Sequence, residues 1–422
     1  MNSQSSAVTN KSRPGILAII LPGVLVAATG IGAGDLATAS FSGSQLGVAI
    51  LWAVVVGGLL KFVLTEGLAR WQLVSGQSLL EGVAKHFGSM AGWLFLPYLL
   101  LWSFFVGSAL MGACGVTLHA MIPVFANASE GKLVFGVAAS LAGLAMVSIG
   151  GFKLFEKVMA VCIAVMFVTV VITAVLLWPG TAAIVSGLLI PTIPDIQGSG
   201  ITWTVALIGG VGGTLTILCY GYWIREKGRE GSDAITTCRI DLGIGYAMTV
   251  IFGLAMVIIG STIEIDGRGA GLLVTLAERL EQPLGLYGRW LFLIGAFGAV
   301  FSSLLGVWQA VPYIFADVWR LFINPSSQVT PANLTRSRPY RLYLWAISIV
   351  PMLGLLMGFK EVQKLYAIIG AAFIPILAIT LLIINGRRGW LGQHRNKPLT
   401  TATLVVTLGF FGGLAWLKFS PV

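Results

Sequence analysis

Asp35 is an acidic residue inside an apolar stretch, LPGVLVAATGIGAGDLATASFSGSQLG (residues 21–47), that is long enough to cross a lipid bilayer. Gly30, Gly32 and Gly34 precede the carboxylate, and glycine is a poor helix former. An ionised carboxylate is costly in hydrocarbon, and irregular backbone is tolerated at membrane depth only where it lines a cavity inside the protein. The stretch therefore predicts a solute-binding site where a membrane helix is interrupted.

Oxygen atoms dominate the groups that this stretch offers to a solute. Carboxylate and backbone carbonyl oxygens are the ligands of hard or still-hydrated cations. We expect Asp35 to bind a metal cation directly, with Thr29, Gly32, Ala33 and Gly34 contributing to the substrate-binding site. The competing interpretation is that Asp35 only caps the helix that begins beside it, since a carboxylate stabilises a helix N-terminus.

A second cluster of glycines, in ALIGGVGGTLTILCYGYW (residues 206–223), interrupts another apolar run, five runs after the first. Interrupted helices in corresponding positions of two halves are typical of transporters built from inverted repeats, with the substrate at mid-membrane. We therefore place Gly210, Gly213 and Thr214 in the same predicted site. The alternative is that these glycines only allow helices to pack closely.

The composition is that of a polytopic α-helical membrane protein. Hydrophobic residues make up 57% of the 422 positions and charged residues 10%, and the mean hydropathy is +0.91. Soluble domains carry about 25% charged residues. About eleven apolar runs are long enough to be membrane spans, at residues 16–46, 48–68, 91–123, 132–149, 155–178, 201–222, 240–262, 289–316, 341–358, 363–385 and 400–419.

The net charge of +10 reflects membrane topology. Basic residues, Arg70, Arg239 and Arg395 among them, are concentrated in alternate connections, which is typical of the cytoplasmic side. Lys11 and Arg13 then place the N-terminus in the cytoplasm, and the first apolar run lacks the features of a removable signal peptide. Because the loops are short, we expect a multi-pass protein of a prokaryotic inner (plasma) membrane.

Two halves of five spans each are expected to follow a short tail. We assign residues 1–14 to a cytoplasmic polar tail, 15–195 to the first repeat, 196–388 to the second repeat, and 389–422 to a loop and an eleventh span. An odd number of spans in each repeat makes the two halves run antiparallel through the bilayer.

The chain lacks the residues for several other functions. Its histidines are His86, His119 and His394, and its four cysteines have no C-x-x-C spacing, so neither a zinc site nor a catalytic centre can be assembled. No G-x-x-x-x-G-K-[ST] motif is present to bind a nucleotide. We expect no enzyme, no permanently bound cofactor and no nucleic acid or nucleotide partner. The expected partners are the lipid bilayer and a small inorganic or organic solute.

Lys61 and Glu66 place two further charges in the second apolar run. Residues five apart do not share one face of a helix. Glu66 lies near the predicted cytoplasmic end with Arg70 one turn on, so we expect a structural ion pair there. Lys61 lies nearer the centre, where it is a candidate to neutralise Asp35 or to bind an anionic substrate.

Several segments resemble the Nramp (natural resistance-associated macrophage protein) family of proton-coupled divalent-metal transporters. LPGVLVAATGIGAGDLATASFSGSQLG is similar to the family's first span, and FKLFEKVMA and SGLLIPTIP resemble the start of its fifth span and the loop before its sixth. CRIDLGIGY and GAVFSSLLGVWQA resemble parts of its seventh and eighth spans. The resemblance implies an all-α polytopic membrane protein with the LeuT-like fold. This fold is an inverted repeat of 5+5 transmembrane helices plus an eleventh helix, with spans one and six broken.

The two motifs that bind metal in that family differ in this chain. GAGD (residues 32–35) stands where the family has DPGN, so the carboxylate is moved by three residues, and GTL (residues 213–215) stands where it has MPH. Soft sulfur ligands favour late transition metals over Mg²⁺ or Ca²⁺, so we do not expect a manganese- or iron-type site copied from the family. The acidic residues that the family places in span three are missing as well.

These observations together predict an Nramp-like secondary transporter that moves a divalent metal or other inorganic cation by alternating access. Its site lies at broken spans one and six, and the coupling ion, proton or sodium, stays open. The alternative is a carrier of a small organic solute or anion on the same fold, because two half-helix N-termini suit a carboxylate group. A receptor or channel that has kept the fold is the third hypothesis.

Overall fold

Helices account for the regular secondary structure of the protein. The computed structural model describes residues 32–263, 269, 271–326, 330 and 333–419, and no β-strand occurs in these ranges. The elements labelled η are π- or 3-10 helices. In chain order the helices are η1 (Ala33–Thr38), α2 (Ala39–Leu46), η2 (Gly47–Ile50), α3 (Leu51–Ser75), α4 (Leu79–Phe87), α5 (Ser89–Met121), α6 (Ala128–Leu176), α7 (Thr181–Leu189), α8 (Gly200–Gly210), α9 (Ile217–Glu226), α10 (Ala234–Gly260), α11 (Leu272–Val318), η3 (Trp319–Ile323), η4 (Leu334–Arg336), α12 (Arg338–Ile349), η5 (Val350–Leu356), α13 (Phe359–Ala371), α14 (Phe373–Gly386), α15 (Arg388–Leu391), η6 (Gly392–His394) and α16 (Pro398–Phe419).

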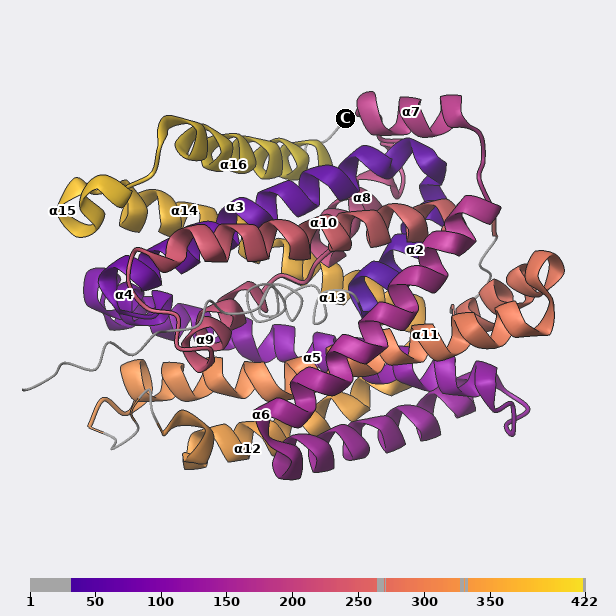
Figure 1. Cartoon of the computed structure of the whole chain (residues 1–422), viewed down its shortest axis with the longest axis horizontal. Coiled ribbons are helices and arrows are strands. Elements are labelled where there is room, and N and C mark those ends of the chain that lie inside the picture. The colour runs from indigo at the N-terminus through magenta and orange to yellow at the C-terminus, as the bar shows by residue number, and fades with distance from the viewer. Residues whose placement is uncertain (1–31, 264–268, 270, 327–329, 331–332, 420–422) are drawn as a thin grey trace, which may run out of the picture.

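Most of these helices are long and apolar enough to form a membrane bundle. Within the described residues, eight helical segments meet the length and composition of a membrane span. A ninth is formed if the pair Phe167–Leu176 and Thr181–Leu189, which is bent by 118°, counts as one span. Figure 1 shows the long helices side by side, most of them along the long axis of the molecule. The predicted all-α polytopic architecture is therefore confirmed.

Eleven spans were predicted, and the count within the described residues is nine when the bent pair is included. The first and sixth predicted spans account for this difference. The predicted first span is described only from Gly32 onward, and its remainder continues through η2 into α3, so that Gly34–Ser75 is one apolar helical stretch. The predicted sixth span consists of two short helices, α8 and α9. Neither of them alone has the length that crossing a bilayer requires.

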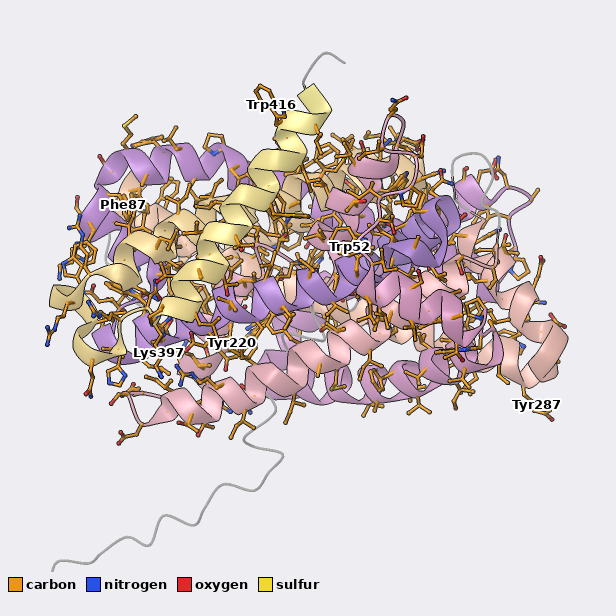
Figure 2. The ribbon with its side chains drawn as sticks, turned by 90° about the horizontal axis from the view of Figure 1, so that it is seen from above. Trp52, Phe87, Tyr220, Tyr287, Lys397 and Trp416 are labelled. Atoms are coloured by element: carbon orange, nitrogen blue, oxygen red, sulfur yellow. The ribbon has the colours of Figure 1, made fainter. Side chains whose placement is uncertain are left out.

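The helices differ in how much of their apolar surface is buried inside the protein. The apolar window of α5 is 78% buried inside the protein, whereas that of α16 is only 17% buried. Figure 2 shows α16 lying across the outside of the bundle, over α3. Because hydrocarbon solvates an apolar helix whose backbone is internally hydrogen-bonded, α16 needs no further cover on its outer face.

α8 and α13 lie towards the centre of the bundle (Figure 1), and η1 packs against both of them. Leu207 and Ile208 of α8 are fully buried, and Gly209 packs closely against the backbone of α13 at Ala367 and Ala371. Small residues allow such close approach between membrane helices. The segments that carry the predicted site therefore lie deep in the protein, where water and lipid are excluded.

Ion pairs join helix ends at the side of the bundle predicted to be cytoplasmic. Arg320 Nε lies 2.7 Å from Asp317 Oδ1. The Nη2 atom of the same guanidinium pairs with Glu81 Oε1 of α4. The Tyr222 hydroxyl on α9 donates to Asp317 over 2.8 Å. Burial raises the pKa of Glu81, but hydrogen bonds from Arg320 and the Ser78 N–H outweigh it, so that pKa falls below its ordinary value. These contacts connect α4, α9 and the end of α11.

Candidate functional site

The chain between α8 and α9 is not helical. α8 ends at Gly210 and α9 begins at Ile217. Gly212 and Gly213 have positive φ angles of 71° and 65°, a backbone region that residues with a Cβ rarely adopt. The interruption predicted in span six is therefore confirmed, and it depends on glycine because of this backbone conformation.

Asp35 connects this break to η1. Its side chain is fully buried, and its Oδ2 accepts a hydrogen bond of 2.9 Å from the backbone N–H of Gly212. Its Oδ1 has no hydrogen-bond partner within the described part of the chain. The N-cap of η1 is Gly32, and no side chain caps this helix. Asp35 therefore lies in the first turn of η1 but makes no capping hydrogen bond to it, and its carboxylate bonds instead to a segment far away in sequence.

Lys61 reaches the same break from α3. Its side chain is fully buried, and its Nζ donates to the carbonyl oxygens of Gly209, over 2.9 Å, and of Val211. Carbonyls at the end of a helix lack intrahelical partners and carry the negative end of the helix dipole. The ammonium group thus lies where a small cation would find ligands, and its charge attracts that of Asp35.

Two buried hydroxyl groups lie on the same segments. Thr38 is one turn after Asp35 and faces Gly210, and Thr214 lies in the break. Both are fully buried, and neither Oγ1 has a hydrogen-bond partner in the ranges that the structure describes. Buried polar atoms are normally hydrogen-bonded, and an exception often marks the place of an ion or ligand. With Asp35 Oδ1, these hydroxyls provide oxygen ligands of the kind that hard cations prefer.

Positions 32 and 34 require glycine for a different reason from the positions in the break. A Cβ on Gly34 would collide with the carbonyl oxygen of Gly210, and a Cβ on Gly32 would collide with the side chain of Ser303 on α11. Both interpretations of the glycine clusters therefore apply, at different positions. Backbone conformation requires glycine in the break, and close packing requires it beside Asp35.

We expect Gly34→Ala to lower the free energy of unfolding by about 1–3 kcal/mol, because η1 and α8 must separate to admit the methyl group. Gly243→Ala on α10 is the matched control, since a Cβ there meets no atom within 4 Å. The control should be neutral or slightly stabilising. Thermal unfolding of the purified variants compares them, and an equal Tm for the two would contradict the close approach of η1 and α8.

Glu66 pairs with two arginines at the end of the bundle predicted to be cytoplasmic. Arg239 lies 2.7 Å from its Oε1, and Arg70, the partner expected from the sequence, lies 3.2 Å from its Oε2. Both oxygens of the carboxylate are thus committed to guanidinium groups. We infer that Glu66 holds α3 to α10 and is not part of the site at Asp35.

Glu66→Gln should therefore leave the affinity for a transported cation unchanged within about twofold, while it lowers protein stability by roughly 1–2 kcal/mol. The loss arises because two arginines lose their shared partner. Equilibrium binding and thermal unfolding measured on the same sample separate the two effects. A loss of cation binding with unchanged stability would show that Glu66 has the coupling role instead.

The remaining predicted residues are placed as follows. Thr29 lies outside the described residues, and of Ala33 the structure describes only the backbone position in η1. Thr38 was not predicted, although it lies only three residues after Asp35 in the same short helix. The hydroxyl of Thr65 contacts both the Lys61 carbonyl and the Tyr246 hydroxyl over 2.7 Å, which orders α3 beside α10.

Among the described residues, the unpartnered polar side-chain atoms of Asp35, Thr38 and Thr214 are all oxygens. No group of three His, Cys, Asp or Glu side chains is placed to hold a metal ion within the described residues. A cation here would rely on one carboxylate together with hydroxyl and backbone carbonyl oxygens. Such ligands suit Mg²⁺, Ca²⁺ and Mn²⁺ better than the later transition metals.

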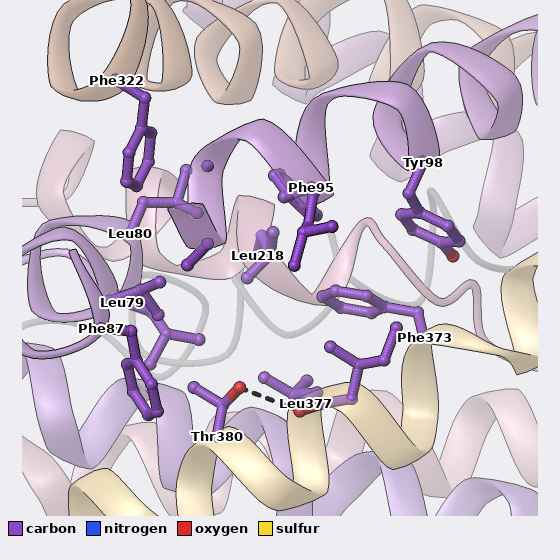
Figure 3. A pocket seen from close by; sticks show the side chains of 15 residues that line it. Leu79, Leu80, Phe87, Phe95, Tyr98, Leu218, Phe322, Phe373, Leu377 and Thr380 are labelled. Carbon is purple, nitrogen blue, oxygen red and sulfur yellow. Dashed lines mark hydrogen bonds between the residues drawn. The ribbon is translucent and has the colours of Figure 1, made fainter. Parts of the chain in front are cut away.

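A separate apolar cavity of about 340 Å³ lies between α4, α5, α9 and α14. Figure 3 shows Leu79, Leu80 and Phe95 pointing into it, with Phe373 on the opposite wall. Its two hydroxyl groups, on Tyr98 and Thr380, both donate to backbone carbonyls. No charged residue lines this cavity, so it does not offer a binding site for a cation.

Sequence comparison relates the chain to membrane transporters. The sequence model of the family described as natural resistance-associated macrophage protein-like (Nramp) matches residues 23–419. The divalent metal cation transporter MntH of Aeromonas hydrophila is 23% identical over 423 residues, covering 93% of each chain. The MntH protein of Klebsiella pneumoniae strain 342 is 25% identical over 329 residues, covering 72% of this chain and 75% of its own.

Structural comparison agrees with this relationship. The manganese transporter of Eremococcus coleocola, solved with an aromatic bis-isothiourea compound, has a TM-score of 0.72 at 17% identity and covers 97% of this chain and 89% of its own. MhsT, solved in complex with L-phenylalanine, has a TM-score of 0.63 at 14% identity, with 96% and 97% coverage. The fold is therefore shared with a manganese transporter and with a protein solved in complex with L-phenylalanine.

Proposed function

We propose that this chain, which belongs to the Nramp family, carries a divalent metal cation across a membrane through a site at Asp35. The observation that carries the proposal is the fully buried carboxylate of Asp35, which bonds to the break in span six and has one oxygen without a hydrogen-bond partner among the described residues. Intramembrane carboxylates of this kind mark ion pathways by default. The names of the relatives, divalent metal cation transporters, support a divalent cation over an organic solute.

The cation would bind through oxygen atoms. Asp35 Oδ1 and the Oγ1 atoms of Thr38 and Thr214 lack hydrogen-bond partners within the described residues, and backbone carbonyls end α8 beside them. Oxygen ligands do not distinguish strongly between Mg²⁺ and Mn²⁺, whereas sulfur ligands do. We therefore propose a substrate range that includes Mg²⁺ and Mn²⁺ together.

Lys61 contributes positive charge beside Asp35. Its ammonium group offsets the negative charge of Asp35. The same group donates hydrogen bonds to the carbonyl oxygens of Gly209 and Val211. A divalent cation close to Asp35 is repelled by this ammonium group and competes with it for the same carbonyls. We propose that substrate binding displaces the Lys61 side chain, so that Lys61 leaves the site when the metal enters it.

Transport would follow alternating access, in which the broken segments move relative to the surrounding helices. The basic end of the bundle, with Arg70, Arg239 and Arg320, would face the cytoplasm. The N-terminus would lie on the same side, in the plasma membrane of a bacterium. The bacterial origin of the relatives supports this location.

Isothermal titration calorimetry on the purified protein tests the proposal. We expect saturable binding of Mn²⁺ and of Mg²⁺ with affinities within about tenfold of each other, because the ligands are oxygen atoms. Titration with sodium chloride at equal ionic strength is the control for non-specific heat. Saturable heat with none of Mn²⁺, Mg²⁺ and Ca²⁺ would overturn the metal assignment and direct the search to organic solutes.

A further inference from the structure

A basic pocket of about 310 Å³ lies far from Asp35, where α3 ends and where α10 and α16 begin. Figure 2 shows Lys397, one of its lining residues, at the same end of the molecule as Phe87 of α4. The positively charged side chains that line this pocket, hereafter the basic pocket, are Arg70, Arg239, Arg395 and Lys397. His394 and the hydroxyl groups of Ser232, Thr236 and Thr400 also line it.

The charge of the basic pocket is only partly neutralised. Glu66 pairs with both Arg70 and Arg239, so one carboxylate is shared between two guanidinium groups. The Arg239 side chain is 46% exposed, and Arg395 and Lys397 are exposed as well. These groups retain donors for a further anion, since a guanidinium has five N–H donors and an ammonium has three.

The pocket is built by specific contacts and is not only a cluster of surface charges. The Arg70 guanidinium donates to the His394 carbonyl over 2.7 Å and to Asn396 Oδ1 over 2.9 Å. Asn396 also donates two hydrogen bonds to α14, from its side-chain amide to the Leu381 carbonyl and from its backbone N–H to the Asn385 carbonyl. These bonds hold the connection before α16 against α3, and so they fix the positions from which Arg395 and Lys397 extend.

The position of the pocket at helix ends is where lipid headgroups are expected. It is formed at the ends of three helices that are long enough to span a membrane, and one of them, α16, exposes most of its apolar surface to lipid. Basic pockets between transmembrane helices are known binding sites for anionic headgroups.

We propose that the basic pocket binds a phosphate group, either the headgroup phosphate of an anionic phospholipid or free inorganic phosphate. Arg239, Arg395 and Lys397 donate to the phosphate oxygens, and Arg70 positions the connection that carries two of them. An acyl chain of a bound phospholipid would lie along the exposed face of α16. This site is independent of metal transport, and its test does not use transport.

The first arm of the test measures lipid retention. Full-length protein in detergent is incubated with equimolar phosphatidylglycerol and phosphatidylcholine of equal acyl chains, and bound lipid is counted by native mass spectrometry. We expect wild type to retain phosphatidylglycerol over phosphatidylcholine by about fivefold or more. The Arg395→Gln/Lys397→Gln variant should lose this preference. Both residues are exposed, so this variant should fold normally.

The control variant removes the same charge elsewhere. Arg341→Gln/Arg388→Gln changes two exposed arginines on α12 and α15, neither of which lines the basic pocket. It should keep the wild-type lipid preference. Equal loss of preference in both double variants, or no preference in wild type together with a negative phosphate arm, would overturn the proposal.

The second arm identifies the source of the phosphate. Thermal unfolding in sodium phosphate is compared with unfolding in sodium chloride of the same ionic strength. A higher Tm in phosphate, absent in Arg395→Gln/Lys397→Gln, would assign the site to free phosphate. Lipid preference without stabilisation by inorganic phosphate would assign it to the phospholipid headgroup.

Discussion

Asp35→Asn is expected to weaken the binding of Mn²⁺ and Mg²⁺ by about 100-fold or more. Substituting groups that only orient a metal ligand already costs roughly 10- to 100-fold in affinity, and Asp35 is proposed as a direct ligand. Asparagine preserves the shape of the side chain and can still accept the Gly212 N–H. It removes the one negative charge at the break, so the loss measures charge and ligation and not a disturbed fold.

Calorimetric titration of wild type and Asp35→Asn measures this effect. Glu230→Gln is the charge-matched control, because Glu230 is exposed in the connection between α9 and α10. The control should bind both cations like wild type. Unchanged affinity in Asp35→Asn, with the monodisperse elution of wild type, would remove Asp35 from the site and leave its burial without a functional explanation.

Lys61→Met has the second large expected effect, and it acts in the opposite direction. Methionine has a similar length but leaves the carbonyls of Gly209 and Val211 without their ammonium donor. We expect divalent cations to bind about tenfold tighter or more, because a repelling positive charge and a competitor for the carbonyls are both removed. Release of the tightly bound cation should then become slower, so turnover should fall although affinity rises.

The control for this prediction is Lys85→Met, which removes an exposed charge from α4. It should change neither affinity nor turnover. Weaker cation binding in Lys61→Met, in a protein that elutes and melts like wild type, would contradict the displacement of Lys61. If Lys61→Met instead abolished uptake of an organic anion, the lysine would be the substrate-binding group of a different kind of carrier.

Features encoded by local spacing could be predicted from the sequence. The four glycines at positions 209, 210, 212 and 213 predicted the break between α8 and α9, because helix interruption is a property of the residues themselves. The apolar runs predicted the bundle for the same reason, since bilayer thickness fixes the length of a span. The motifs compared with the Nramp family predicted the fold that the structural comparisons bear out.

Contacts between distant segments could not be predicted in the same way. Lys61 was placed near the centre of span two, but its two carbonyl partners lie about 150 positions later and depend on how α3 packs against α8. Thr38 was missed because a threonine in an apolar helix is common and gains meaning only from its unpartnered hydroxyl. The hydrogen bond from Gly212 to Asp35 also joins segments that lie 177 positions apart, which local spacing does not reveal.

The chain differs from the family in its metal-binding motif and still has the family's fold. The carboxylate at position 35 still lies beside the break in span six, although it is displaced by three residues in sequence from the family's aspartate. The Lys61 amino group donates hydrogen bonds to two backbone carbonyl oxygens at that break. The proposed site therefore combines the family architecture with oxygen donors and a lysine amino group among the described residues, and this combination differs from the family's metal-binding motifs.

Uptake of Mn²⁺ into proteoliposomes is the measurement that tests the central claim most directly. Wild type and Asp35→Asn are reconstituted in parallel at equal protein density, with a Mn²⁺-quenched dye inside the vesicles and protein-free vesicles as the background. The account predicts saturable uptake by wild type that falls to the background in Asp35→Asn. The account would be contradicted if wild type took up Mn²⁺ only at the rate of protein-free vesicles, although the protein is incorporated into the same lipids and elutes as a folded species.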